Sequence, residues 1–196
     1  MPVFDENILF LHIPRSGGSI IENKLKETYT MKFYGSDTSG LSLQHYTANE
    51  LIKKNVDIDK MFSFTFVRNP FDKILSTYLN WSIDHTKSFD DYIDMVKNVV
   101  ENKLYYKISA INTNDLSHFK PQVELLENLK SDFVGKFENY ENDIKILSKM
   151  HPKLTCLNEI NIKKREVDYK QHYSERNRNI IEELYKNDLI KFKYTF

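Results

Sequence analysis

A short apolar segment that runs into a glycine-rich turn constrains this chain more than any other feature. Residues 8–13 are apolar apart from one histidine and predict a buried strand. The strand breaks at residues 14–19, Pro-Arg-Ser-Gly-Gly-Ser, and an amphipathic helix is expected over residues 19–29. The unpaired amide groups at the start of a helix converge on one point and attract anions. The segment therefore predicts a binding site for an oxyanion.

The residue types in the turn support this prediction. Gly17 and Gly18 lack the Cβ atoms that would keep an oxyanion away from the backbone amides. Arg15 adds a permanently charged guanidinium suited to phosphate or sulfate oxygens. The turn has no Lys-Ser/Thr pair after its glycines, which are adjacent, so it is not a Walker A motif. A magnesium-bound nucleotide is therefore not the first expectation.

Composition restricts the class of protein. A chain of 196 residues fits one domain over residues 1–196, and no shift in composition marks a linker. Its 28 basic and 28 acidic residues balance, which argues against nucleic acid as a partner, because nucleic-acid binders carry a basic excess. One cysteine, Cys156, excludes an internal disulfide. The N-terminal segment has neither a basic region nor a long apolar stretch, so we expect no signal peptide or membrane anchor.

Strands and helices are expected to alternate along the chain. Further strands are predicted at residues 61–67 and 132–137, and helices at residues 48–53 after a capping box, 70–81, from 88 onward, 122–129, 140–150 and 174–188. This alternation predicts an α/β sandwich with a mainly parallel sheet. Ligands of such sheets bind beyond the carboxyl ends of the strands, where residues 14–19 and 68–69 would lie.

A second anion site is predicted where the strand at residues 61–67 ends. Arg68 leaves the strand, Asn69 can cap the next helix, and Pro70 suits its first turn. Lys73 and Ser76 fall on the polar side of that helix, so Arg68 and the Ser76 hydroxyl can converge on a phosphate. The alternative is an arginine that pairs with a carboxylate and a serine that is only solvated.

The two segments together resemble a known family. His12-Ile-Pro-Arg-Ser-Gly-Gly-Ser19, followed by Phe66-Val-Arg-Asn-Pro-Phe-Asp-Lys-Ile-Leu-Ser-Thr-Tyr78, is similar to the two cofactor signatures of sulfotransferases that use 3′-phosphoadenosine 5′-phosphosulfate (PAPS). The resemblance is strongest to the carbohydrate branch with the heparan and chondroitin enzymes. Residues 44–51, 118–122, 133–139 and 185–196 also match the pattern, so the resemblance spans nearly the whole chain.

The resemblance implies a P-loop-like three-layer sandwich and a role for each cofactor-binding residue. It assigns the 5′-phosphosulfate to Arg15, Ser16, Gly17, Gly18 and Ser19, and the 3′-phosphate to Arg68 and Ser76. The basic run Lys163-Lys164-Arg165 matches a late loop that folds over the cofactor phosphates; its other interpretation is a solvated charge cluster. The family usually has lysine at the position of Arg15, and arginine holds its proton too firmly to donate it, so Arg15 should act electrostatically.

The reaction needs a base for the acceptor hydroxyl, and histidine is suited to that task near neutral pH. We predict His45, which lies just before a capped helix where related enzymes place a histidine. The alternative interpretation of His45 is a surface or helix-flanking residue. A glutamate is a further alternative for the base. His12, inside the first strand, is expected to pack beside the loop, while His118 is a further candidate for contact with acceptor or cofactor. No metal is expected, since no ligand cluster has convincing spacing.

The leading interpretation is therefore a sulfotransferase that acts on a hydroxyl of a sugar or glycan, with a cytoplasmic location expected from the lack of an anchor. A P-loop kinase of a small molecule is the first alternative, although the chain lacks the lysine after the glycines that it would require. A non-catalytic nucleotide-binding relative is the second.

Overall fold

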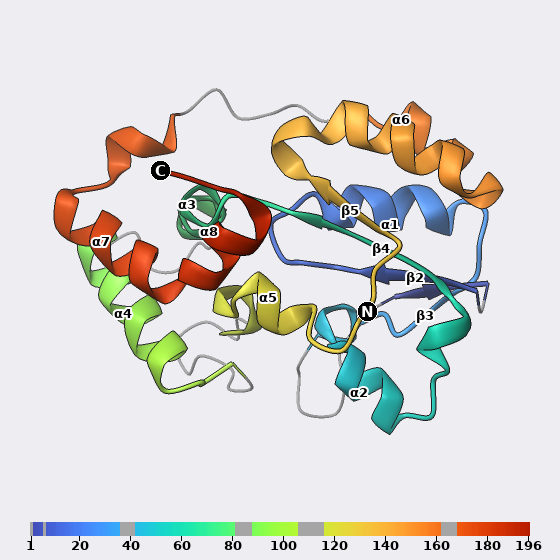
Figure 1. Cartoon of the computed structure of the whole chain (residues 1–196), viewed down its shortest axis with the longest axis horizontal. Helices are drawn as coiled ribbons and strands as arrows, with labels where there is room; N and C mark the ends of the chain where they lie inside the picture. The colour runs from blue at the N-terminus through green and yellow to red at the C-terminus, as the bar shows by residue number, and fades with distance from the viewer. Residues whose placement is uncertain (1, 6, 36–41, 81–87, 106–115, 162–167) are drawn as a thin grey trace. The chain divides into compact units, whose positions relative to one another are not determined.

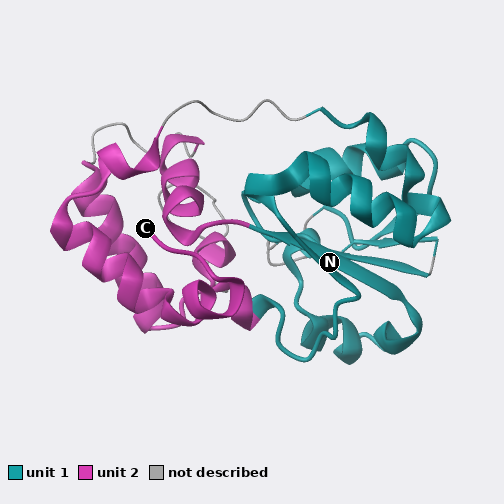
Figure 2. Cartoon of the chain, turned by 45° about the horizontal axis from the view of Figure 1, so that its top comes forward, with its two compact units in different colours: residues 1–67, 125–164 teal, residues 68–124, 165–196 magenta. Residues whose placement is uncertain are grey.

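The computed structural model describes residues 2–5, 7–35, 42–80, 88–105, 116–161 and 168–196. Contacts divide the chain into two compact units (Figure 2): residues 1–67 with 125–164, and residues 68–124 with 165–196. The chain passes between the units three times, so no single linker separates them. The organisation of residues 1–196 as one domain stays a prediction, and each unit is described by itself.

The first unit contains a five-stranded sheet in the order β3-β1-β2-β4-β5. Strands β2 (Ile8–Leu11), β4 (Phe62–Val67) and β5 (Phe133–Lys136) pair in parallel. Strands β1 (Val3–Phe4) and β3 (Met31–Lys32) pair antiparallel at one edge. The three strands that the sequence predicted are therefore parallel, as expected. The edge strands β1 and β3 were not predicted, and the short connection from β1 to β2 allows only an antiparallel pair.

Helices cover both faces of this sheet (Figure 1). Helices α1 (Gly18–Lys26) and α6 (Tyr140–Met150) lie over one face, and α2 (Ala48–Lys53) lies on the opposite side. Alternate side chains of β2 and β4 point into the core beneath α1 and α6, as the two-residue period of a strand requires. The buried members of this core are Phe4, Ile8, Phe10, Ile21, Leu25, Phe64, Phe66, Tyr140, Ile144, Leu147, Leu154 and Leu157.

The second unit, in its described part, consists of helices and short turns. Its helices are α3 (Pro70–Asn80), α4 (Phe89–Glu101), α5 (Gln122–Leu125), α7 (Glu175–Leu184) and α8 (Lys186–Phe192). They enclose an aromatic-rich core of Phe71, Ile74, Tyr92, Ile93, Val96, Val99, Val100, Tyr105, Leu116, Phe119, Ile181 and Tyr185. The 3₁₀ segments of the two units are η1 (Leu43–His45), η2 (Ile58–Lys60), η3 (Leu116–Phe119), η4 (Phe137–Asn139), η5 (Pro152–Glu159) and η6 (Tyr169–His172).

Local sequence signals predicted several element boundaries correctly. Helix α6 begins and ends as expected, and Thr47 forms the predicted capping box with Glu50 at the start of α2. The Asn69 side chain accepts a hydrogen bond from the Phe71 amide at 3.2 Å, as expected for a residue that caps α3. These signals act over a few neighbouring residues, which is why the sequence displays them.

Two helix predictions were wrong in extent. The helix expected over residues 122–129 is only the short α5, and the one expected over 174–188 is interrupted between α7 and α8. The interruption falls at Tyr185, whose buried hydroxyl donates to the Phe119 carbonyl at 2.6 Å. This tertiary bond is absent from the local periodicity, so the sequence pattern could not reveal it.

Within the part of the chain that is described, no helix combines the length and the apolar character needed to cross a membrane.

Candidate functional site

The turn after β2 has the backbone geometry of an open helix start. Gly17 is the N-cap of α1 with φ 83°, a left-handed conformation that glycine adopts without steric cost. Arg15 also has a positive φ of 65°, a conformation that is uncommon for a residue other than glycine. Among the residues that the structure describes, no side chain caps α1, and the first turn of this helix contains no acidic residue. The amides at this helix start are therefore oriented to receive an anion.

A buried hydroxyl beside this helix start gives a second, independent indication of a ligand. Ser16 is 1% exposed, and its Oγ has no hydrogen-bond partner among the described residues. A buried polar group without a partner costs about 1–3 kcal/mol, so it requires an explanation. An oxyanion at the start of α1 would supply the missing acceptor for Ser16. Ser19, in the first turn of α1, is exposed.

His12 lies directly beneath the turn. A Cβ atom on Gly18 would lie 2.4 Å from the His12 ring, so only glycine allows this approach of helix and histidine. The His12 Nδ1 lies 2.6 Å from a carboxylate oxygen of Glu22 on α1, and both side chains are buried. Since Nδ1 is engaged by Glu22, the orientation of the ring under the turn is set.

His45 lies against the same histidine. Its ring, on η1, contacts the His12 ring edge to face, with a centroid separation of 5.3 Å and an interplanar angle of 89°. The structure thus brings the predicted base and the glycine-rich turn together through His12, although thirty-three residues separate the two histidines in sequence. The role of His45 as a base stays a prediction.

Arg68, in the second unit, is held by a carboxylate. Its Nε donates to Asp72 Oδ2 at 2.8 Å, and its Nη2 lies 2.7 Å from the same oxygen. The carboxylate pairing that the sequence left open as an alternative is therefore present. It occupies one edge of the guanidinium and fixes the plane in which the remaining donors lie. Binding of a phosphate by Arg68 and Ser76 stays a prediction.

The prediction that Lys73 and Ser76 lie on a polar side of α3 is wrong. Lys73 and Ser76 are 1% and 2% exposed, instead of facing solvent. The Lys73 Nζ donates to the His118 carbonyl at 2.5 Å. This hydrogen bond to a distant residue replaces part of the hydration that the ammonium loses on burial. The helical periodicity of α3 could not reveal such a partner.

Burial of Lys73 has a measurable consequence. It lowers the pKa of the Lys73 ammonium from 10.5 to about 8; Asp188 opposes this shift and Arg68 adds to it. Between these two values the unfolded chain binds a proton that the folded chain does not, so stability should rise with pH. We expect the free energy of unfolding to increase by about 2 kcal/mol from about pH 7.5 to about pH 9.5, at about 1.4 kcal/mol per pKa unit.

Urea denaturation at several pH values checks this expectation. The variant Lys73→Met should lose the increase, because it removes the titrating group. Lys186→Met, at an exposed lysine of the same unit, should retain it. An equal pH dependence in wild type and Lys73→Met would show that Lys73 titrates near its ordinary value.

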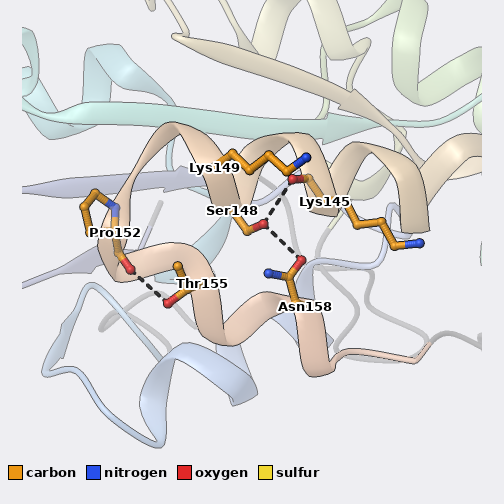
Figure 3. Close-up of a pocket in the computed structure, with 6 residues that line it drawn as sticks. All are labelled: Lys145, Ser148, Lys149, Pro152, Thr155 and Asn158. Atoms are coloured by element: carbon orange, nitrogen blue, oxygen red, sulfur yellow. Dashed lines mark hydrogen bonds between the residues drawn. The ribbon is translucent and has the colours of Figure 1, made fainter.

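Figure 3 shows a pocket in the first unit, and none of its lining residues belongs to the turn. It measures about 540 Å³ and lies between α6 and η5, lined by Lys145, Ser148, Lys149, Pro152, Thr155 and Asn158. The Ser148 hydroxyl bonds to Asn158 and the Thr155 hydroxyl donates to the Pro152 carbonyl, so these hydroxyls already have partners. Contact with the turn comes from the other end of α6, where the Tyr140 hydroxyl donates to the Gly17 carbonyl at 3.3 Å.

Some predicted features lie beyond what the structure describes or tests. Lys163, Lys164 and Arg165 fall outside the described residues, and so does the predicted end of α3 at Trp81. Among the described residues no group of three or more His, Cys, Asp or Glu side chains gathers as metal ligands do. The expectation that no metal is required stays a prediction.

Sequence reasoning missed the partners of the predicted site residues. No role was assigned to the carboxylates Glu22, Asp72 and Asp188. Glu22 bonds to His12, Asp72 bonds to Arg68, and Asp188 bonds to Gln122. The spacing of Arg68 and Asp72, four residues apart at the start of a helix, is a signal that could have found one of them. The other contacts depend on tertiary packing.

Comparison with protein families gives a match over nearly the whole chain. A family model described as the sulfotransferase family matches residues 4–195. A comparison with curated proteins gave no match.

Proposed function

The chain belongs to the sulfotransferase family, and we propose that it transfers the sulfuryl group of PAPS to a hydroxyl acceptor. The observation that carries this proposal is the buried Ser16 hydroxyl without a partner among the described residues, next to an uncapped helix start. Both features suit an oxyanion, which could accept from the hydroxyl and from the amides of the helix start.

Each end of the donor has its own set of residues in this proposal. Arg15, Ser16, Gly17, Gly18 and Ser19 hold the 5′-phosphosulfate through amides, hydroxyls and one guanidinium. Arg68 and Ser76, in the second unit, hold the 3′-phosphate. The run Lys163, Lys164 and Arg165, which lies outside the described residues, adds positive charge. Support comes from the family match, which includes all of these positions.

The proposed chemistry is an in-line displacement. The acceptor oxygen forms a bond to sulfur while the bond from sulfur to the 5′-phosphate oxygen breaks, and 3′-phosphoadenosine 5′-phosphate leaves. His45 takes the proton of the acceptor hydroxyl. Arg15 and the amides of the turn stabilise the charge that grows on the departing phosphate, where fixed donors are most effective.

The finer assignments belong to the same proposal. The acceptor is a sugar or glycan, no metal takes part, the protein is cytoplasmic, and its fold is a P-loop-like three-layer sandwich. The parallel strands β2, β4 and β5 with helices on both faces of the sheet are compatible with that fold.

Calorimetry with three nucleotides tests the proposal. Wild-type protein should bind 3′-phosphoadenosine 5′-phosphate at least about thirtyfold more tightly than adenosine 5′-phosphate, because loss of one partner of a buried charge pair costs about 2–5 kcal/mol. This preference should disappear in Arg68→Ala. Tighter binding of ATP with Mg²⁺ would instead favour a kinase, and binding without transfer to any hydroxyl acceptor would favour a non-catalytic relative.

A further inference from the structure

A buried side-chain amide holds the backbone of Arg68 on both of its hydrogen-bonding groups. Gln122 is fully buried; its Oε1 accepts from the Arg68 amide at 2.9 Å and its Nε2 donates to the Arg68 carbonyl at 2.8 Å. Strand β4 ends at Val67, so Arg68 is the first residue beyond it. The Gln122 amide provides there the pair of bonds that a neighbouring strand would provide, and so restricts the backbone of Arg68.

A buried carboxylate fixes Gln122 in turn. The Asp188 carboxylate accepts hydrogen bonds from the backbone N–H groups of Gln122 and Val123, both at 2.8 Å. It also accepts one from the side-chain Nε2 of Gln122 at 3.2 Å. Its side chain is fully buried, and the ammonium of Lys73 offsets part of its charge. Asp188 thereby holds both the backbone and the side chain of Gln122.

These bonds allow only one orientation of the Gln122 amide. Its oxygen faces an N–H group, and its nitrogen faces two acceptors, the Arg68 carbonyl and Asp188. A flipped amide would set donor against donor and acceptor against acceptor. An aliphatic side chain of the same length would keep the volume but leave the buried Arg68 amide and carbonyl without these partners.

Together, Gln122 and Asp72 restrain Arg68 at both ends. Gln122 holds the backbone, while Asp72 holds the guanidinium through Nε and Nη2. An arginine restrained in this way loses little side-chain freedom when it binds a ligand, which raises affinity without any further contact.

We propose that Gln122, held by Asp188, is a positioning residue that sets Arg68 for recognition of the 3′-phosphate of the donor. This inference rests on the proposed function, since it concerns the phosphate assigned there to Arg68. Gln122 itself does not touch the donor. It acts through Arg68, and its contribution therefore depends on the guanidinium being present.

The affinity ratio of two nucleotides measures this contribution. We take the affinity for 3′-phosphoadenosine 5′-phosphate divided by that for adenosine 5′-phosphate, both from calorimetry. In Gln122→Met the ratio should fall roughly ten- to hundredfold, because a misplacement of about 1 Å can cost about a hundredfold. The affinity for adenosine 5′-phosphate, which lacks the 3′-phosphate, should stay within about twofold of wild type.

A matched control separates positioning from general destabilisation. Asn177 is a fully buried amide in the same unit that donates to Asp90 at 2.6 Å. We expect Asn177→Leu to lower thermal stability but to leave the affinity ratio of the folded protein unchanged. A fall of the ratio in Asn177→Leu equal to that in Gln122→Met would overturn the proposal, because the effect would then be general.

A double-mutant cycle tests whether Gln122 acts through Arg68. In an Arg68→Ala background, Gln122→Met should cause no further fall in the ratio, since contributions through one group are not additive. A further fall of the same size, or an unchanged ratio in Gln122→Met alone, would overturn the proposal. If Gln122→Met does not fold, Gln122→Asn, which keeps the amide but is one methylene shorter, carries the same expectations.

The same measurements distinguish failure of the proposed function from failure of the positioning role of Gln122. Wild-type protein that binds both nucleotides equally would refute the 3′-phosphate assignment before any substitution is made, and this inference would fall with it. A wild-type preference that persists in Gln122→Met would refute the inference alone.

Discussion

Replacement of His45 by alanine is expected to lower kcat for sulfuryl transfer by about 10²–10⁴-fold, the usual contribution of a general base. The His45 ring contacts His12, which packs under the glycine-rich turn, so the base would lie beside the proposed phosphosulfate site. Affinity for 3′-phosphoadenosine 5′-phosphate should stay within about twofold of wild type, because a proton acceptor contributes to the transition state and not to binding of this product. Steady-state kinetics together with calorimetry measure both quantities.

A control and a pH profile make this result specific. His172→Ala, at an exposed histidine, should leave kcat unchanged. The acidic limb of the pH profile of kcat/KM should be present in wild type and absent from the residual activity of His45→Ala. If His45→Ala retains wild-type kcat and the same acidic limb, a carboxylate is the base and His45 only packs beside the turn.

Gly18→Ala should strongly weaken binding of the donor. The new Cβ would lie 2.4 Å from the His12 ring, closer than such atoms approach in proteins. The ring cannot retreat freely, because Glu22 holds its Nδ1 and its face stacks on Phe10. The start of α1 must therefore shift, and we expect affinity for 3′-phosphoadenosine 5′-phosphate to fall about a hundredfold or more. Overpacking should also cost about 1–3 kcal/mol of stability.

Gly135→Ala on β5 provides the matched control. It places a Cβ atom 2.4 Å from the buried Phe66 ring, a clash of the same size in the same unit. Thermal denaturation should report comparable destabilisation of the two variants, while calorimetry below both transitions should report loss of binding only in Gly18→Ala. Equal affinity of the two variants would mean that the close contact of Gly18 with His12 does not shape the anion site.

Helix and strand boundaries were predictable where neighbouring residues determine them. The Thr47 capping box and the limits of α6 are set by bonds and patterns within a few residues. The break between α7 and α8 at Tyr185 was not visible in the local pattern. The hydroxyl of this buried residue bonds to the Phe119 carbonyl, sixty-six residues away in sequence, and such a contact leaves no local signal.

The same distinction applies to the candidate site. The glycine-rich turn before α1 could be predicted because it is built from consecutive residues, and its role as an anion site stays a prediction. Lys73 and Ser76 were placed on the wrong side of α3, because the periodicity of a helix shows which residues share a face but not what covers that face.

By itself the sequence predicted the glycine-rich turn at residues 14–19 as an oxyanion site and determined the position of Arg68 directly after a strand, because both are local arrangements of backbone and charge. Tertiary structure alone decided which groups support them. Glu22 sets His12 under Gly18, and Gln122 holds the backbone of Arg68 from fifty-four residues away. These contacts form only when distant segments pack together, and burial then makes each unpaired polar group costly enough to require its specific partner.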